Sequence, residues 1–313
     1  MLRLGLCCKF IQQPIKFRMA TAANLSHYAE KGNNPHAFLS ELILDNVKAL
    51  HQALSWCVDQ EIGSFRVGSS LFALYTHPQF HYTLEDLPDG EEIKKQLNLC
   101  KTLASDTDMR LVLHPDQFVV LNALDSQIVK NSIQELEYQN TLADFVGADV
   151  INIHGGGVYG DKISSLKRLE TNLKQLSKGV LEKLTLENDE KCFTPHDLIP
   201  LCLKVGIPFV YDVHHHHCLA DGLGIEEATM QAIETWDREP LFHVSSPKNG
   251  WSGLNPEQHH DYIDIRDFPA SWRSIGDATI EVEAKGKELA VLKLQKELAA
   301  EGIELWKPKN LRV

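Results

Sequence analysis

Residues 110–154 read RLVLHPDQFVVLNALDSQIVKNSIQELEYQNTLADFVGADVINIH. Two short apolar runs rich in β-formers, RLVLH (110–114) and DVINIH (149–154), stand at the ends of this stretch. Between them, the apolar residues of 128–148 recur at spacings of three and four, which predicts a helix. A strand, a helix and a second strand in this order are typical of a parallel βαβ unit.

The same alternation continues over the whole chain, and helical patterns also occupy 37–60 and 287–302. Eight strands are predicted: LRLGLCC (2–8), SFRVGS (64–69), RLVLH (110–114), DVINIH (149–154), LTLEN (184–188), IPFVYD (207–212), PLFHVS (240–245) and ATIEVE (278–283). Eight such units favour a closed (β/α)₈ TIM barrel over an open doubly wound sheet, because no GxGxxG turn follows any strand. We therefore predict one α/β domain, a single TIM barrel over 1–313.

Composition restricts the class of protein. With 43% hydrophobic and 24% charged residues, the chain resembles an ordinary globular protein, and no apolar run is as long as a membrane helix. The segment MLRLGLCCKFI (1–11) is interpreted as a first strand rather than a signal peptide. Seven scattered cysteines without CxxC spacing predict neither a disulfide framework nor a thiolate zinc site. We expect a cytoplasmic protein, nucleoid-associated if bacterial, that does not bind membranes.

Six consecutive predicted strands end in a histidine or a carboxylate: His114, His154, Glu187, Asp212, His243 and Glu283. In a TIM barrel, side chains at the C-terminal ends of the strands converge on one mouth. A single histidine at a strand end is more often a hydrogen-bonded polar residue than a ligand. Six such residues together indicate a functional site.

Imidazoles and carboxylates are the ligands that Mn²⁺, Zn²⁺ or Fe²⁺ accept. Three carboxylates in one pocket would repel one another without a cation. One catalytic ion usually takes three protein ligands, so this many donors predict two or three ions. Alternation along the last strand also turns Glu281 inward, two residues before Glu283.

Four consecutive histidines follow Asp212 in VYDVHHHHCLADG (210–222). We expect His215, in the turn after the sixth strand, to hold a second ion beside the one bound by Asp212. The other three histidines, His214, His216 and His217, are not required as ligands. A solvated polar loop is the simpler interpretation for them.

The loop after His114 places a polar and an aromatic residue, Gln117 and Phe118, near the mouth. An aromatic side chain is more often part of a core. In a loop of this kind, however, an aromatic ring can stack on a nucleic-acid base.

Taken together, these residues resemble the UV damage endonucleases, metal-dependent barrel enzymes related to the AP endonucleases and the xylose-isomerase-like barrels. The matching stretches run in family order along nearly the whole chain: GLCC (5–8), FRVGSSLF (65–72), HPDQF (114–118), NIHGGGVYGDK (152–162), LENDE (186–190), DVHHH (212–216), HVSSP (243–247), HHDYI (259–263) and VEAKGKE (282–288). Jointly they are specific, although each alone is weak. The resemblance implies an enzyme that cuts DNA immediately 5′ of pyrimidine photoproducts and leaves a 3′ hydroxyl.

The resemblance also implies a cluster of up to three ions, usually Mn²⁺, with Zn²⁺, Co²⁺ or Mg²⁺ as alternatives. Glu187 would bridge two ions and would be a catalytic residue. Its partners would be His114 and His154 on one side and Asp212, His243 and Glu283 on the other. Asp212, His215 and a histidine of HHDYI would hold the third ion; His259 is preferred and His260 is the alternative. His77 matches a further histidine of the family site.

For the substrate, the resemblance places Gln117 and Phe118 where the family has a Gln–Tyr pair that probes the lesion. Further substrate contacts are expected from Asn152, Tyr159, Lys162 and Ser245, and Lys285 is expected to be catalytic. Leu6 and Phe10 replace polar or hydrogen-bonding residues of some relatives, so contacts to the damage from that loop are not implied.

The net charge of −12 argues against a protein that binds nucleic acid non-specifically. Bound divalent ions would nevertheless make the mouth locally positive. Basic residues also gather after the fourth, seventh and eighth strands: Lys162, Lys167, Arg168, Lys248, Arg266, Arg273, Lys285 and Lys287. The expected partner is double-stranded DNA that carries UV lesions, bound by a monomer.

Two other functions compete with this one. A sugar isomerase or epimerase on the same barrel would use metals on a small polyol, but it usually holds them mainly on carboxylates, whereas this chain offers histidines from five segments. A module that stores metal or binds damaged DNA without cutting it would bind saturably without turnover.

Overall fold

The computed structural model describes residues 1–309, and its centre is a closed barrel of eight parallel strands in sequence order. The strands are β1 (Leu2–Cys7), β2 (Ser64–Val67), β3 (Arg110–Leu113), β4 (Val150–His154), β5 (Leu184–Glu187), β6 (Phe209–Asp212), β7 (Leu241–Val244) and β8 (Ala278–Val282). The ring closes where β1 pairs with β8, with Leu4 opposite Ile280. All eight predicted strands are present, and the (β/α)₈ TIM barrel is confirmed.

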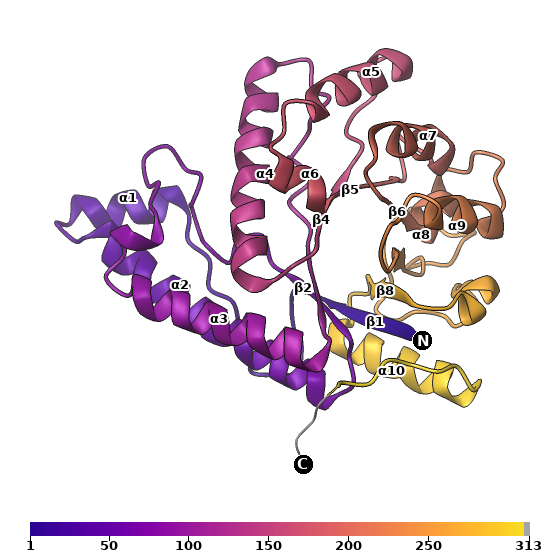
Figure 1. Cartoon of the computed structure of the whole chain (residues 1–313), viewed down its shortest axis with the longest axis horizontal. Coiled ribbons are helices and arrows are strands. Elements are labelled where there is room, and N and C mark those ends of the chain that lie inside the picture. The colour runs from indigo at the N-terminus through magenta and orange to yellow at the C-terminus, as the bar shows by residue number, and fades with distance from the viewer. Residues whose placement is uncertain (310–313) are drawn as a thin grey trace.

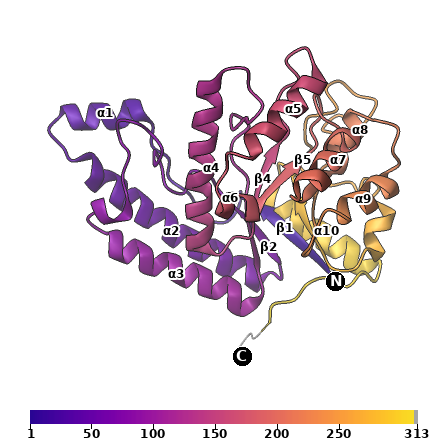
Figure 2. The same ribbon diagram turned by 45° about the horizontal axis from the view of Figure 1, so that its top comes forward.

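Helices surround the barrel (Figures 1 and 2). They are α1 (Ala22–Glu30), α2 (Pro35–Asp59), α3 (Gly90–Thr107), α4 (Ser126–Val146), α5 (Lys162–Leu173), α6 (Lys178–Lys183), α7 (Pro195–Val205), α8 (Val213–Cys218), α9 (Ile225–Ile233) and α10 (Lys287–Ala300), with 3₁₀ turns η1 (Leu84–Asp86) and η2 (Ala270–Ser274). In both views α1, α2 and α3 form one flank and α7, α8 and α9 lie on the opposite flank. None of the helices in 1–309 has the length and hydropathy of a membrane span.

The β3–α4–β4 unit shows how the sequence produces this arrangement. The side chain of Asp125 caps α4 by accepting a hydrogen bond from the backbone N–H of Gln127. Gly147 ends the helix in the left-handed conformation, with φ 81°, which glycine adopts without steric cost. The apolar face of α4, including Leu136 and Leu142, is buried in the main core between helices and strands.

The inside of the barrel is layered. Four side chains form a separate small apolar cluster: Val112, Val150, Val210 and Leu241. Buried polar side chains such as Asn152, Thr185 and Glu187 follow further along the strands. Strand alternation therefore directs apolar residues to the middle of the barrel and polar residues to the C-terminal mouth.

The β7–β8 connection differs from the others because it contains only the 3₁₀ turn η2 and no α-helix among the described residues. The prediction of one domain over 1–313 includes residues 310–313, which lie outside the described residues, and it stays a prediction. The seven cysteines are all free, as expected.

Candidate metal centre

All six strand-end residues meet at the C-terminal mouth, where they and His215 form three overlapping groups of potential metal ligands. The groups are His114, His154 and Glu187; Glu187, Asp212 and His215; and Asp212, His243 and Glu283. Within each group, the donor atoms lie within 4.8 Å of one another. Glu187 belongs to the first two groups and Asp212 to the last two, so the three positions adjoin.

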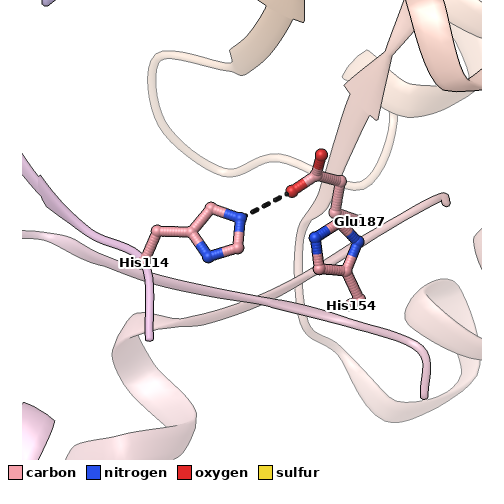
Figure 3. A group of neighbouring side chains, drawn as sticks. All are labelled: His114, His154 and Glu187. Carbon is pink, nitrogen blue, oxygen red and sulfur yellow. Dashed lines mark hydrogen bonds and ion pairs between the residues drawn. The ribbon is translucent and has the colours of Figure 1, made fainter. Parts of the chain in front are cut away.

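The first group lies at the ends of β4 and β5 and at the start of the loop after β3 (Figure 3). His114 Nε2 is 3.1 Å from Glu187 Oε2, and the ring of His154 lies 5.3 Å from that of His114. Asn152, on β4, donates its amide N–H to the same oxygen of Glu187. His154 Nδ1 is buried and has no hydrogen-bond partner among the described residues.

The second group depends on the start of α8. Asp212 is the N-cap of this helix, and its Oδ1 accepts a hydrogen bond of 2.7 Å from the backbone N–H of His215. This cap brings His215 Nδ1 to 3.6 Å from Asp212 Oδ2 and 3.5 Å from Glu187 Oε1. The turn expected after the sixth strand is thus a short helix, and its first turn positions His215.

The third group is centred on His243, which is fully buried. Its Nδ1 lies 3.0 Å from Glu187 Oε1, 3.5 Å from Glu283 Oε1 and 3.9 Å from Asp212 Oδ2. Its other nitrogen, Nε2, lies 3.0 Å from Glu281 Oε2. A carboxylate behind a ligating histidine is the usual device that fixes the tautomer and ring orientation of such a ligand.

Arg66, on β2, was not part of the predicted site. Its guanidinium is buried and pairs with both Glu281 and Glu283, at 2.6 Å in the case of Glu283. Phe65 and Val67 join the main core, so strand alternation turns Arg66 into the barrel. A charged residue in the middle of a short buried strand was the sequence signal that could have identified it.

Burial and neighbouring charges act in opposite directions on these groups. Burial alone would raise the pKa of Glu187, but the imidazoles of His243 and His154 hold it well below its usual range. Burial alone would lower the pKa of His243, but the Glu187 carboxylate raises it to about 10. In the same way, Asp212 and Glu187 overcome burial and raise the pKa of His215 well above its ordinary value. The carboxylates therefore favour the positively charged forms of His215 and His243.

Divalent ions fit this centre. Besides His154 Nδ1, Asp212 Oδ2 is buried and has no hydrogen-bond partner among the described residues. Buried polar atoms of this kind carry a desolvation cost that coordination to a cation would remove. Mixed imidazole and carboxylate donors suit Mn²⁺, Zn²⁺, Fe²⁺ or Co²⁺, and they do not discriminate among these ions.

The other two histidines proposed from the family pattern lie at the edge of the centre. His259 Nδ1 is 3.9 Å from Glu283 Oε2, and its ring is 6.3 Å from that of His215. His260 is turned to the backbone of Tyr262, so the structure favours His259 of the two. His77 belongs to none of the three ligand groups in the described residues; it lines a cavity of about 790 Å³ with Asp116 and Phe118.

The solvated-loop interpretation of the histidine run is wrong for two of its residues. His214 is fully buried, and His216 is buried between Tyr211 and Asp221, with hydrogen bonds of 2.7 and 2.8 Å to their side chains. Only His217 is exposed as expected. The difference arises because these residues form α8, in which residues 213–216 are all buried, and because Trp251 and His259 cover His214.

The residues expected to contact substrate occupy different environments. Gln117 and Phe118 are exposed in the β3–α4 loop, and Phe118 is 77% exposed, so it is not a core residue. Asn152 is fully buried beneath Glu187, and Ser245 is also buried, with no hydrogen-bond partner for its Oγ among the described residues. For Asn152 the geometry supports orientation of Glu187 rather than contact with substrate.

The remaining expected contacts are basic or aromatic. Tyr159 is exposed beneath the guanidinium of Arg168, at 5.6 Å. Lys162 forms an ion pair of 2.7 Å with Asp197. Lys285 is exposed near the mouth.

Leu6 and Phe10, where the chain differs from the family pattern, pack inward. Leu6 is fully buried, and Phe10 packs its ring against Trp56 at 5.3 Å and Phe65 at 6.1 Å.

The role of His215 can be separated from that of its neighbours. His215→Ala should lower the bound metal by about one ion per chain, because one of the three ligand groups loses its only imidazole. His217→Ala is the matched control, since its exposed ring packs on Trp251 at 4.4 Å and belongs to no ligand group. Elemental analysis after dialysis gives the stoichiometry. Equal losses in the two variants would show that the ligand was assigned to the wrong histidine.

The sequence and the fold of this chain were compared with those of known proteins. A family described as "UV-endonuclease UvdE" matches residues 2–311. A UV DNA damage endonuclease of Bacillus velezensis is 32% identical over 262 residues, which cover 80% of this chain and 79% of the relative. Among solved structures, SacUVDE superposes with a TM-score of 0.84 and 27% identity, covering 97% of this chain and 100% of the other.

Two more distant structures show the fold alone. Endonuclease IV from Thermus thermophilus has a TM-score of 0.57 at 15% identity and covers 80% of this chain and 94% of its own. D-psicose 3-epimerase from Clostridium cellulolyticum has a TM-score of 0.56 at 12% identity, with coverages of 82% and 93%. Both identities are too low to transfer chemistry.

Proposed function

This chain belongs to the UV-endonuclease UvdE family and is an endonuclease of UV-damage repair, and from that premise we propose how it acts on DNA. It hydrolyses the phosphodiester immediately 5′ of a UV photoproduct in duplex DNA. The photoproducts are cyclobutane dimers and 6-4 photoproducts, with abasic sites as a further substrate. Two or three divalent ions held by the ligand groups at the mouth would support this reaction.

The observation that carries the proposal is the sharing of Glu187 and Asp212 among three adjoining ligand groups. Divalent ions bound there would lower the pKa of a nucleophilic water and stabilise the charge on the phosphate and on the leaving oxygen. Glu187 and Asp212 would each contribute to two of the three ligand groups, and Asn152 fixes the rotamer of Glu187. Glu281 orients His243, while Arg66 offsets the charge of Glu281 and Glu283.

Recognition of the lesion is assigned to the β3–α4 loop. It begins at the ligand His114 and carries the exposed Phe118 four residues later. A damaged base pair is easier to unstack than a normal one, so a ring presented beside the metal centre can take the place of a displaced lesion. Gln117, Tyr159, Lys162 and Ser245 are proposed as further substrate contacts, and Lys285 as a catalytic residue.

The proposed metal, oligomeric state, additional ligands and compartment follow the family resemblance. Mn²⁺ is the proposed metal, with Zn²⁺, Co²⁺ or Mg²⁺ as alternatives, and the proposed active form is a monomer. His259 and His77 are proposed as additional ligands. The cytoplasm, or the nucleoid in a bacterium, is the proposed compartment. The sugar isomerase or epimerase alternative is not favoured, because the family and the UV DNA damage endonuclease relative point to DNA.

An end-labelled duplex with one defined photoproduct tests this function. With Mn²⁺, the wild-type enzyme should produce a single nick directly 5′ of the lesion, and the undamaged duplex should stay intact. Chelation of the metal should abolish the nick. Saturable binding without any nick would instead indicate a damage-binding module.

Metal binding should compete with protons. The Glu187 carboxylate raises the pKa of His243 to about 10, so His243 is protonated in the metal-free protein at pH 7. An ion must displace that proton, and the affinity for Mn²⁺ should therefore rise about tenfold per pH unit for each proton displaced, in the range below pH 10. Titration calorimetry at pH 7 in buffers of different ionisation enthalpy should show at least about one proton released per chain. Binding that is independent of pH between 6 and 9 would contradict the assignment of His243.

A further inference from the structure

A finger of the β7–β8 connection, residues 248–258, projects from the rim of the metal centre. Its base is closed by an antiparallel bridge between Pro247 and His259. Two backbone hydrogen bonds reinforce the base, from Lys248 N–H to the Gln258 carbonyl at 2.6 Å and from His260 N–H to the Ser246 carbonyl at 2.8 Å. Because His259 lies against Glu283, the finger starts at the edge of the ligand cluster.

The tip of the finger has a fixed shape. The Asn249 side chain donates a hydrogen bond of 3.1 Å to the carbonyl of Leu254, and Gly253 N–H donates to the Gly250 carbonyl at 3.0 Å. A Cβ on Gly253 would lie 2.3 Å from the Asn249 carbonyl oxygen, so only glycine fits at that position. The turn closes at Asn255, which has a left-handed φ of 54°.

Trp251 anchors the finger to the barrel. Its ring packs on His217 at 4.4 Å and on the buried His214 at 5.1 Å. Its indole N–H donates a hydrogen bond of 2.8 Å to Asp267. Two histidines of α8, His214 and His217, therefore hold the finger in place through Trp251. Neither of them belongs to a ligand group, so this contact gives them a structural role.

Leu254 stands at the tip and is 82% exposed, the most exposed large apolar side chain in 1–309. A single exposed leucine usually needs no explanation. Here, however, the leucine is held at the tip of a loop with several internal hydrogen bonds. In the closed ring, β7 lies four strands from β3 in either direction, so the finger and the loop of Phe118 begin on opposite sides of the mouth.

We propose that Leu254 is a second apolar wedge, which enters the duplex on the side of the metal centre opposite Phe118. This inference rests on the proposed function. Leucine is among the side chains that insert between base steps and kink a duplex, and one side chain is sufficient for that contact. A stable protein partner would instead need about 800 Å² on this face, far more than one leucine at the end of a narrow loop provides.

The charge at the base of the finger agrees with DNA as the ligand. Lys248 is exposed and forms no ion pair among the described residues. An unpaired cation beside an apolar wedge can contact the phosphate that flanks the opened step. With Phe118 and Leu254 on opposite sides, the scissile phosphate would be held over the ions between them.

Fluorescence anisotropy with a photoproduct duplex tests the proposal, using a non-hydrolysable linkage 5′ of the lesion so that binding is measured without cutting. Leu254→Ala should weaken binding about tenfold, because most of the apolar contact of the side chain is lost. Leu254→Met, which keeps the apolar volume, should bind like the wild type. Leu203→Ala is the matched control: this leucine is 53% exposed near the end of α7, away from the mouth, and its truncation should change nothing.

Two other measurements separate the wedge from a structural role. Leu254→Ala should leave the melting temperature and the metal content unchanged. Lys248→Ala should reduce the slope of log K against log salt by about 0.9, whereas Leu254→Ala should not alter it.

The outcomes distinguish this proposal from the function on which it rests. If the wild type neither prefers nor cuts the damaged duplex, the proposed function fails and the wedge fails with it. If the wild type binds and cuts but Leu254→Ala binds within twofold of it, the function stands and the wedge is wrong.

Discussion

Replacing Glu187 with glutamine should lower the rate of DNA cleavage by at least about 10³-fold while the fold is retained. Glu187 is fully buried, and its two oxygens face His114, Asn152 and His243. Glutamine keeps the volume but removes the charge that two ligand groups share. Two ions should then be lost or displaced together, so the loss should exceed that for a ligand that serves one position.

Single-turnover cleavage of the photoproduct duplex at saturating Mn²⁺ measures this effect. Glu304→Gln, an exposed change beside Leu2 at the start of β1, removes the same charge at the end of the barrel opposite the mouth and should cut at the wild-type rate. Affinity for damaged duplex should fall much less than the rate for Glu187→Gln. A correctly folded Glu187→Gln enzyme with near wild-type turnover would exclude a shared ligand at this position.

Truncating Phe118 to alanine should weaken binding of damaged DNA about 5- to 150-fold, the equivalent of about 1–3 kcal/mol of stacking. The side chain is 77% exposed and follows the ligand His114 by four residues, outside the ligand groups. Metal content and melting temperature should therefore stay unchanged. Affinity for undamaged duplex should change little, because an intact stack leaves no gap for the ring.

The direct test of Phe118 compares the affinities of Phe118→Ala for damaged and for undamaged duplex. Phe118→Trp is the control variant, because it keeps an aromatic ring that can stack. Truncating a buried phenylalanine would cost about 3–5 kcal/mol of stability. A large fall in melting temperature with normal affinity for the lesion would make Phe118 a packing residue and remove the role of this loop in damage recognition.

The barrel and most of the ligand cluster could be predicted from the sequence because both follow from local rules. Strand and helix periods alternate eight times, and parallel strands direct their C-terminal residues to one mouth. His114, Glu187 and Glu283 were therefore placed together without knowledge of any contact between them. The spacing of Asp212 and His215 also predicted their proximity correctly, since a helix N-cap and the residue three positions later are neighbours.

The features that were missed depend on contacts between segments far apart in the sequence. Arg66 and Glu281 are 215 residues apart and meet only because β2 and β8 both flank β1 in the closed ring. His214 is polar and lies in a run of polar residues, so nothing local indicated its burial beneath Trp251. The finger at 248–258 is held by turns and by an indole contact with α8, which no periodic pattern reveals.

Anomalous X-ray diffraction from crystals grown with Mn²⁺ tests the shared-ligand metal centre most directly. The predicted result is two or three adjoining peaks at the C-terminal mouth. One lies between His114, His154 and Glu187, and another lies between Glu187, Asp212 and His215. The third position is between Asp212, His243 and Glu283. Glu187 should contact at least two of the ions. A single peak without Glu187 as a ligand, or peaks away from these residues, would contradict the metal centre described for this enzyme.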